Sequence, residues 1–436
     1  MEMKYSLLKK IYDRDAIVAI IGLGYVGLPL ALCFCNKGFK VIGFDVDHEK
    51  TDMLKNGFSY ISHIKSSEVV AAVSDGLSIS NDISDTRIAD VVIICVPTPL
   101  NKHREPDISF VINAIDGVKP YLHSGQLISL ESTTYPGTTE EELQPRIESR
   151  GLTIGEDIFL VFSPEREDPA NPFYTTSTIP KVCGGITIHC LDVGVALYQS
   201  IIETVVPVSS TRVAEMTKLL ENIHRAVNIG LVNEMKIVSD KMGIDIFEVV
   251  KAAATKPFGY AAYYPGPGLG GHCIPVDPFY LSWKSKEYGI HTRFIELAGE
   301  VNAAMPDWVI SKIVFALNEK FKSIKGSKIL VLGVSYKKNV DDIRESPSIH
   351  LMDKLSRLGA LISYSDPYVP KIENISEYQV AMSSINLSAE SISGYDCVLV
   401  ATDHDDFNYD MIKMCSQLIV DTRGRFIEDG DLVIRA

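Results

Sequence analysis

The sequence lacks most of the features that mark nucleic-acid-binding, secreted and membrane-embedded proteins. Its 42 Lys and Arg residues are outnumbered by 56 Asp and Glu residues, which gives the 436-residue chain a formal charge of −14. Nucleic-acid binding requires basic patches, so that partner class is excluded. The longest apolar run near the start, residues 16–23, is too short to span a bilayer, and acidic residues precede it. We therefore expect a cytoplasmic protein without a membrane segment.

Cysteine pairs and repeats are also missing. The eight cysteines are too sparse for a disulfide scaffold and none stands in a CxxC pair, so we expect a reducing compartment and no bound metal. Low-complexity segments and short-period repeats are absent. What remains is an ordinary globular composition, 46% hydrophobic and 22% charged, in a chain long enough for two or three domains.

The first motif is a glycine-rich turn between an apolar strand and a helical pattern. Gly22, Gly24 and Gly27 stand in GxGxxG spacing there, and a pyrophosphate can bind at the helix N-terminus that follows such a turn. The next strand ends in Asp45, 18 residues after Gly27. A carboxylate at this place can accept hydrogen bonds from ribose hydroxyls and would repel a 2′-phosphate. The pattern predicts NAD rather than NADP.

Three later apolar strands each end in a polar loop. The loops begin at Pro97-Thr98, at Glu131 and at Pro164-Glu165. In a doubly wound sheet the carboxyl ends of the strands border the crevice where ligands bind. Glu165 can serve there as a general base beside a substrate alcohol, and a solvated acidic turn is the ordinary alternative.

The middle of the chain has a long helical pattern. Residues 210–242 carry apolar side chains at three- and four-residue steps, which predicts a helix of about 30 residues, roughly 45 Å long. Lys218 and Asn222 lie four residues apart and project from one face. On a partly buried face an ammonium and an amide can stabilise a developing oxyanion, whereas on a solvent face they form a routine polar pair. We expect two further helices, over residues 293–302 and 307–320, with Pro306 in a first helical turn.

A glycine-rich loop follows at residues 266–277 and presents Cys273 and Asp277. The glycines and prolines can sustain neither helix nor strand, so backbone N–H groups can approach a ligand here. Asp277 is close enough in sequence to orient a water or a proton beside the thiol. Cys273 is thus a candidate nucleophile, and an inert buried cysteine is the alternative.

The last part of the chain repeats the theme of a strand followed by a glycine. Residues 327–333 form such a pair, and Lys337, Lys338 and Arg344 follow, a cluster that indicates a diphosphate site in an acidic chain. We therefore predict an α/β protein in which two Rossmann-like doubly wound domains are joined by a central helical domain with a long helix. The expected boundaries are 1–208 for an NAD-binding domain, 209–310 for the helical domain with the cysteine loop, and 311–436 for the last domain.

Seven ordered motifs resemble those of the UDP-glucose/GDP-mannose dehydrogenase family, the NAD-dependent nucleotide-sugar 6-dehydrogenases. The motifs are GLGYVGLPLA at Gly22, VPTP at Val96, ESTTYPGTT at Glu131, SPER at Ser163, EMTKLLEN at Glu215, GGHCIPVDP at Gly270 and GVSYKKNVDDIRES at Gly333. The resemblance implies a UDP-sugar substrate held by the last domain and a homodimer formed through the central helices.

The resemblance also implies a role for each matching residue. The catalytic residues would be Cys273, Lys218, Asn222, Asp277, Glu165 and Thr133. The NAD-binding residues would be Gly22, Gly24, Tyr25, Val26, Gly27, Asp45, Pro97, Thr98, Thr133 and Arg344. The substrate-binding residues would be Glu165, Arg166, Lys218, Asn222, Tyr260, Tyr264, Gly270 and Lys337.

In such an enzyme the sugar C6 hydroxymethyl is oxidised twice, through a cysteine thiohemiacetal and a thioester, to a uronic acid. The SPERED and GGHC segments, residues 60–64 and residues 258–265 resemble the branch that acts on UDP-N-acetylhexosamines, which implies UDP-N-acetylglucosamine and the synthesis of a surface polysaccharide, O-antigen or capsule. UDP-N-acetylgalactosamine, UDP-N-acetylmannosamine and UDP-glucose stay open as substrates. A one-step NAD-dependent alcohol dehydrogenase and a non-catalytic NAD-binding regulator are the alternative functions.

Overall fold

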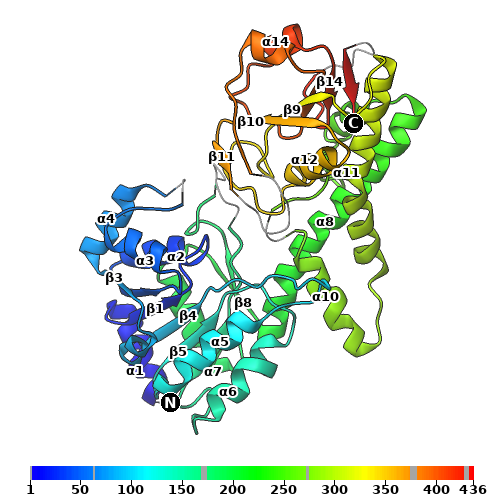
Figure 1. The fold of residues 1–436 in the computed structure, drawn as a ribbon. Coiled ribbons are helices and arrows are strands. Elements are labelled where there is room, and N and C mark those ends of the chain that lie inside the picture. The colour runs from blue at the N-terminus through cyan, green and yellow to red at the C-terminus, as the bar shows by residue number, and fades with distance from the viewer. Residues whose placement is uncertain (1, 62–63, 168–173, 272–273, 374–380, 427–431) are drawn as a thin grey trace. The chain divides into compact units, whose positions relative to one another are not determined.

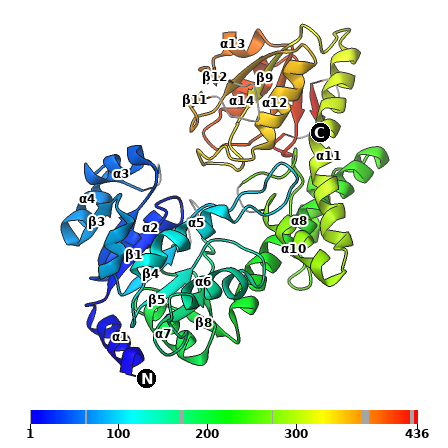
Figure 2. The ribbon, with the colours of Figure 1, turned by 60° about the horizontal axis from the view of Figure 1, so that its bottom comes forward.

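The computed structural model describes residues 2–61, 64–167, 174–271, 274–373, 381–426 and 432–436 (Figure 1). The chain divides into two compact units (Figure 2). One comprises Met1–Glu221 and Phe279–Ile290, and the other comprises Asn222–Pro278 and His291–Ala436.

The first unit is built on an eight-stranded sheet with the order β3-β2-β1-β4-β5-β6-β7-β8. Its strands are β1 (Ile17–Ile21), β2 (Lys40–Phe44), β3 (Leu77–Ser80), β4 (Val91–Ile94), β5 (Leu127–Leu130), β6 (Phe159–Phe162), β7 (Lys181–Gly185) and β8 (Val205–Val208). All pairings from β3 to β6 are parallel. β4, β5 and β6 are buried along their whole length, as expected for strands with helices on both faces of the sheet.

Strand β7 reverses this parallel pattern. It pairs antiparallel with β6, with Gly185 opposite Val161 and Gly184 opposite Phe162. Its first residue, Lys181, therefore lies at the edge of the sheet where β5 and β6 end. The sequence predicted neither β7 nor β8, because β7 is only five residues long and two of them are glycines. The glycines are required by packing, since a Cβ at Gly184 would lie 2.2 Å from a backbone oxygen.

The first unit also contains most or all of each of the following helices and short helical turns. They are α1 (Glu2–Asp13), α2 (Gly27–Asn36), α3 (His48–Lys55), α4 (Ser66–Asp75), η1 (Ile83–Ile88), α5 (Ser109–Val118), η2 (Lys119–Tyr121), η3 (Thr139–Leu143), α6 (Gln144–Glu148), α7 (Ile188–Gln199), α10 (Asp277–Ser285) and η4 (Lys286–Tyr288). α2 packs against β1 and β2, and α7 packs against β6 and β7. The apolar strands and the helices from α1 to α7 form one continuous hydrophobic core.

Two long helices, α8 (Thr211–Met242) and α11 (Arg293–Glu319), dominate the middle of the chain, with the short α9 (Ile246–Ala253) between them. The expected long helix is confirmed by α8. The expected pair of helices at 293–302 and 307–320 is wrong, because α11 runs through Pro306 without a break. Packing against α8 offsets the backbone hydrogen bond that this proline removes. A Cβ at Gly230 would lie 3.2 Å from Ala298, and Asn233 donates to Asn302 at 2.8 Å in the buried contact.

The second unit also contains a parallel five-stranded sheet, in the order β10-β9-β13-β14-β15. Its strands are β9 (Lys328–Leu332), β10 (Leu361–Ser365), β13 (Cys397–Val400), β14 (Ile419–Asp421) and β15 (Val433–Arg435). The helices α12 (Pro347–Arg357), α13 (Ala389–Ser393) and α14 (Tyr409–Cys415) belong to this sheet region, and β11 (Lys371–Ile372) pairs with β12 (Met382–Ser383) beside it.

The first turns of the two sheets are built alike. Gly22 N–H donates to the carbonyl of the last residue of β2, and Gly333 N–H donates to the carbonyl of the last residue of β10. The following amide donates to Asp45 in the first unit and to Asp366 in the second, at 2.9 and 2.7 Å. The predicted fold class, two Rossmann-like domains with a helical middle, is therefore confirmed.

Candidate active site

The glycine turn after β1 has the shape that a dinucleotide requires. A Cβ at Gly22 would lie 2.6 Å from the Cys95 carbonyl oxygen, and one at Gly27 would lie 1.8 Å from the Gly22 carbonyl oxygen. Nothing lies within 4 Å of a Cβ built on Gly24. The outer glycines thus close the turn and pack α2 against the sheet, while the middle one leaves space in which a pyrophosphate can approach the backbone and the N-terminus of α2. Tyr25 and Val26 are half-buried in the same turn.

Asp45 holds this turn in place and still has room for a ligand. Its Oδ2 accepts from Leu23 N–H at 2.9 Å and its Oδ1 accepts from Asp47 N–H at 3.0 Å. A carboxylate has about four lone-pair sites, so acceptor positions remain for ribose hydroxyls. Tyr60 donates its hydroxyl to the Leu23 carbonyl oxygen, a support for the turn that the sequence did not reveal.

The other predicted cofactor residues lie in different places. The Thr98 carbonyl oxygen, beside Pro97, accepts from the Tyr280 hydroxyl at 2.8 Å, and Thr98 is buried. Thr133 is half-buried just after β5. Arg344 belongs to the second unit, where its guanidinium pairs with Asp342 at 2.6 Å. The contacts of these residues with NAD stay predictions.

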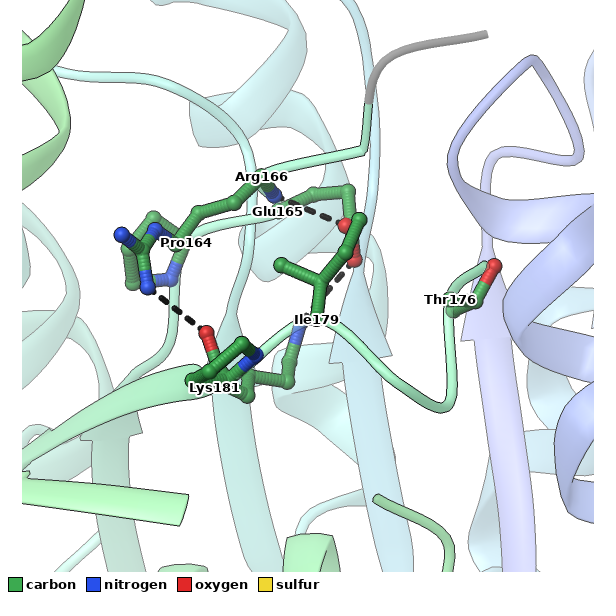
Figure 3. Close-up of a pocket in the computed structure, with 7 residues that line it drawn as sticks. Pro164, Glu165, Arg166, Thr176, Ile179 and Lys181 are labelled. Carbon is green, nitrogen blue, oxygen red and sulfur yellow. Dashed lines mark hydrogen bonds and ion pairs between the residues drawn. The ribbon is translucent and has the colours of Figure 1, made fainter. Parts of the chain in front are cut away.

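Glu165 is fixed at the end of β6 by three donors, of which Arg166 and Lys181 are drawn in Figure 3. Its Oε1 accepts from Arg166 N–H at 2.7 Å and Glu167 N–H at 2.8 Å, and its Oε2 accepts from Lys181 Nζ at 3.0 Å. Burial raises the pKa of this carboxyl, but the Lys181 ammonium and the backbone donors outweigh burial and hold the pKa below its ordinary value. Glu165 is therefore an ionised carboxylate at neutral pH.

Lys181 is the main residue that the sequence analysis missed. Besides Glu165, its Nζ contacts Glu131 Oε2 at 2.8 Å, and the Tyr198 hydroxyl donates to Glu131 Oε1 at 2.6 Å. Lys181 and Glu131 are almost completely buried. Burial raises the pKa of Glu131, and the Lys181 cation offsets part of that effect. No motif signals Lys181, since only the reversal of β7 brings it to this edge.

Helix α8 is fastened to the SPER loop through two side chains. Lys218 Nζ donates to the Glu165 carbonyl oxygen at 2.6 Å, and the Arg166 guanidinium pairs with Glu221 at 2.5 Å. Arg166 also donates to the Pro180 carbonyl oxygen at 2.7 Å (Figure 3). Lys218 is only 8% exposed, so the expectation that this face of the helix is partly buried is confirmed. The predicted contact of Arg166 with substrate stays a prediction, and its visible role is to anchor the loop.

In the second unit, Asn222 donates its amide to Asp277 Oδ2 at 2.5 Å, and both residues are buried. The predicted nucleophile Cys273 lies outside the described residues, but the glycines before it are described. A Cβ at Gly270 would lie 2.7 Å from Tyr336 Cβ, and Gly271 N–H donates to the Arg344 carbonyl oxygen at 3.1 Å. The glycine loop thus lies directly on the loop that carries Lys337 and Arg344.

The loop that carries Lys337 and Arg344 is hydrogen-bonded to a buried imidazole. His404 Nδ1 accepts from Asn339 N–H at 2.9 Å, and its Nε2 lies 3.0 Å from both Ser335 Oγ and Asp366 Oδ2. Lys337, on this loop, is half-buried, and its contact with a diphosphate stays a prediction. The predicted substrate residues Tyr260 and Tyr264 are exposed by 39% and 49%, and their contacts with substrate stay predictions.

Four of the described cysteines are poorly suited to attack a carbonyl. Burial raises the pKa of Cys33 to about 11 and that of Cys35, Cys183 and Cys397 to about 12, so their thiolate fractions at neutral pH are small. Within the described ranges no group of His, Cys, Asp and Glu residues is arranged to hold a metal ion. Across the same ranges, every helix is too short or too polar to cross a membrane.

Comparisons with known proteins agree with this geometry. Residues 16–202 match the NAD binding domain of the UDP-glucose/GDP-mannose dehydrogenase family, residues 212–304 match its central domain and residues 330–429 match its UDP binding domain. The chain belongs to this family, and its cofactor is NAD.

The similar proteins differ in the sugar that their names specify. A UDP-N-acetyl-D-glucosamine 6-dehydrogenase of Pseudomonas aeruginosa is 34% identical over 90% of this chain and 92% of its own length. A UDP-N-acetyl-D-mannosamine dehydrogenase of Methanococcus maripaludis is 33% identical over 93% and 91%. The solved structure of a UDP-D-ManNAc dehydrogenase from Pyrococcus horikoshii superposes with a TM-score of 0.86 at 29% identity, covering 96% of this chain and 98% of that one.

Replacing Asp45 by alanine is expected to weaken NAD binding about 10- to 100-fold, because hydrogen bonds to a charged acceptor are lost. Asp47→Ala is the matched control, since Asp47 caps α3 by accepting from Glu49 and Lys50 amides. That variant should lose about 1 kcal/mol of stability and keep its NAD affinity. Calorimetric titration with NAD measures the affinity of each variant, and urea unfolding measures its stability. Equal affinities in the two variants would contradict the role of Asp45.

Proposed function

We propose that the protein oxidises the C6 hydroxymethyl of a UDP-N-acetylhexosamine to the carboxylate, with UDP-N-acetylglucosamine as the first candidate. The observation that supports this most strongly is the packing of Gly270 and Gly271 on the loop of Tyr336 and Arg344. It joins the segment that leads to the predicted nucleophile to the loop that presents Lys337 in the UDP binding domain. A sugar attached to a diphosphate at Lys337 would then extend toward the cysteine loop.

The cofactor fits the first unit. Gly22, Gly24, Gly27 and Asp45 would hold NAD through its pyrophosphate and ribose, and bound NAD accepts hydride from the sugar carbon. The protein's own task is to take the alcohol proton and to stabilise the charges that develop on the sugar oxygen.

Glu165 contributes charge and position more than strong basicity. Its lowered pKa keeps Glu165 ionised. Together with the Thr133 hydroxyl, Glu165 would hold a water molecule, and this water would take up the alcohol proton. The Glu165 carbonyl oxygen meanwhile anchors Lys218 at 2.6 Å. Lys218 and Asn222 lie four residues apart on α8, and we propose that both face the reacting C6 oxygen, where Asp277 orients the Asn222 amide.

Cys273 would make the second oxidation achievable. Its thiolate adds to the aldehyde carbon, which forms a C–S bond and an oxyanion that Lys218 and Asn222 stabilise. Loss of a second hydride from that carbon to a second NAD, which would be held by the same residues as the first, leaves a thioester. Water would then cleave the C–S bond to release the uronic acid and the thiol. A one-step alcohol dehydrogenase needs no cysteine at this place, and a non-catalytic regulator needs none of these buried polar contacts.

The substrate proposal is tested by initial rates with four UDP-sugars: the N-acetyl derivatives of glucosamine, galactosamine and mannosamine, and UDP-glucose. The expected order has an N-acetylhexosamine first, with UDP-N-acetylglucosamine preferred. A larger kcat/KM with UDP-N-acetylmannosamine would replace the proposed epimer and keep the branch. A preference of more than tenfold for UDP-glucose would refute the branch itself.

The product class, a sugar uronic acid attached to UDP, suits the building of a surface polysaccharide such as O-antigen or capsule. We propose the cytoplasm as the compartment, because the reaction requires a free thiol and the reducing cytoplasm preserves it. We propose no nucleic-acid partner, because the chain has a formal charge of −14 and nucleic-acid binding requires basic patches.

We also propose that the protein forms a homodimer through its central helices. Leu231, Met235, Val238 and Met242 follow one another at helical spacing along α8, and each is between 41% and 66% exposed. On α11, Phe294 is 80% exposed. A stripe of this kind on a helix normally packs against a partner, and a second copy presents the same stripe.

The dimer proposal predicts that Leu231→Arg converts the protein to a monomer, because a charge is placed in the middle of the apolar stripe. The control is Met414→Arg, at a side chain that is 79% exposed on α14 and outside the stripe. Light scattering coupled to size exclusion measures the mass of each variant. A monomeric wild type, or a dimeric Leu231→Arg, would refute this interface.

A further inference from the structure

The reversed strand β7 delivers a lysine to the place where two parallel strands end. The pairing of Val161 with Gly185 and of Phe162 with Gly184 continues to Lys181 opposite Glu165 if the register is extended. β5 ends next to β6, and Glu131 is the first residue after β5. Had β7 run parallel to β6, Lys181 would lie at the opposite edge of the sheet. The antiparallel direction therefore serves to bring a cation to two carboxylates.

The contacts of Lys181 with the two carboxylates are short and buried. Nζ lies 2.8 Å from Glu131 Oε2 and 3.0 Å from Glu165 Oε2, and the lysine side chain is 4% exposed. Beneath it, the Tyr198 hydroxyl joins Glu131 to Ser129 Oγ at 2.6 and 2.7 Å. Removal of one member of such a buried charge cluster leaves another uncompensated, which is costly.

Glu165 links the contact with Lys181 to a side chain of α8. Its side chain folds back so that Oε1 accepts from the amides of the next two residues, and this orients the peptide group whose carbonyl oxygen accepts from Lys218 Nζ. A chain of direct contacts thus runs from Lys181 through the Glu165 side chain and main chain to Lys218. Ser163 Oγ donates to the Val182 carbonyl oxygen at 2.8 Å, which ties the same loop to β7.

We propose that Lys181 is a positioning residue for the oxidation of the UDP-sugar: it clamps the Glu165 carboxylate against Glu131 and thereby sets the ammonium of Lys218. This inference rests on the proposed function. It assigns Lys181 no contact with substrate or NAD. Its effect is to keep Glu165 ionised and the SPER loop in one conformation, so that the proton acceptor and the oxyanion donor hold their places during both oxidations.

A pH-dependent readout must take account of the other charged and titratable groups near this carboxylate. They are Glu131 after β5, Cys95 after β4, Cys183 on β7, Tyr198 on α7, Cys33 on α2, Lys218 and Glu221 on α8, and Arg166 and Glu167 on the same loop. Burial raises the pKa of the cysteine thiols Cys33, Cys95 and Cys183 above their ordinary value, so these stay neutral below pH 8. Among these groups, Glu131 contacts the same Lys181 ammonium as Glu165. Replacing Glu131 therefore shows how much of the effect of Lys181 depends on Glu131.

The test compares wild type with Lys181→Met, Glu131→Gln and the double variant Glu131→Gln/Lys181→Met. Turnover of UDP-N-acetylglucosamine is followed from pH 5 to 9. Lys181→Met is expected to lower kcat about 10²-fold, the typical effect of a displaced catalytic group. The acid limb of its pH profile should move upward by a unit or more, since Glu165 then shares its site with Glu131 and no cation. The double variant should move the limb back down, because the competing carboxylate is gone.

Glu131→Gln alone keeps the clamp on Glu165 and should retain kcat within threefold. If Lys181 served only to neutralise Glu131, the double variant would regain kcat to within threefold of wild type, and the proposal would be overturned; the proposal expects the double variant to keep the low kcat of Lys181→Met, because Glu165 still lacks its cation. A Lys181→Met profile with an unmoved acid limb would overturn it as well, since a purely structural lysine lowers the rate equally at every pH.

A measurement without substrate separates this inference from the proposed function. The melting temperature of Lys181→Met should fall more steeply than that of wild type between pH 5 and 8, because a carboxyl whose folded pKa is raised loses its stabilising effect as the pH rises. The double variant should show a shallower fall. If wild type reduces no NAD with any UDP-sugar, the proposed function fails and the positioning role fails with it, while the melting data still decide whether Lys181 clamps Glu165.

Discussion

The buried contact between Lys181 and Glu165 is the interaction on which the arrangement of the first unit's polar edge depends. It requires β7 to run against β6, and it stabilises a carboxylate whose pKa burial alone would raise. Because the same glutamate offers its carbonyl oxygen to Lys218, the position of an ammonium on α8 follows from a charge pair on the sheet. The reversal of β7, which lies between β6 and β8, is thus part of the site and not an irregularity of the fold.

A second constraint acts in the other unit, where glycine is needed for contact distance. At Gly270 the neighbouring Tyr336 and Pro347 leave no space for a Cβ, so the cysteine loop can lie on the basic loop only if it has no side chain there. Beneath that loop, His404 joins Asn339 to Asp366. Asp366 corresponds to Asp45, and Ser335 stands where the first unit has Gly24, so the two turns share a backbone plan and differ at the position that is open in the first unit.

Much of this could be read from the sequence, and the gaps have physical causes. Gly22, Gly24, Gly27 and Asp45 form a local pattern whose geometry follows from the strand and helix around it, and α8 has a long, regular apolar period. β7 could not be predicted, because its direction is fixed by long-range pairing with β6 and not by its five residues. Lys181 was missed for the same reason. Pro306 was placed at a helix start by a local rule, which the contacts of Gly230 and Asn302 between α8 and α11 override.

An enzyme that carries out two oxidations on one sugar carbon forms two NADH for each UDP-N-acetylhexosamine that it consumes. We therefore expect two NADH and a uronic acid by mass analysis for wild type, and no more than one NADH with accumulating aldehyde for Cys273→Ser, whose hydroxyl is a far weaker nucleophile than a thiolate. One NADH and a free aldehyde from the wild-type enzyme would contradict the thioester route and identify a one-step dehydrogenase.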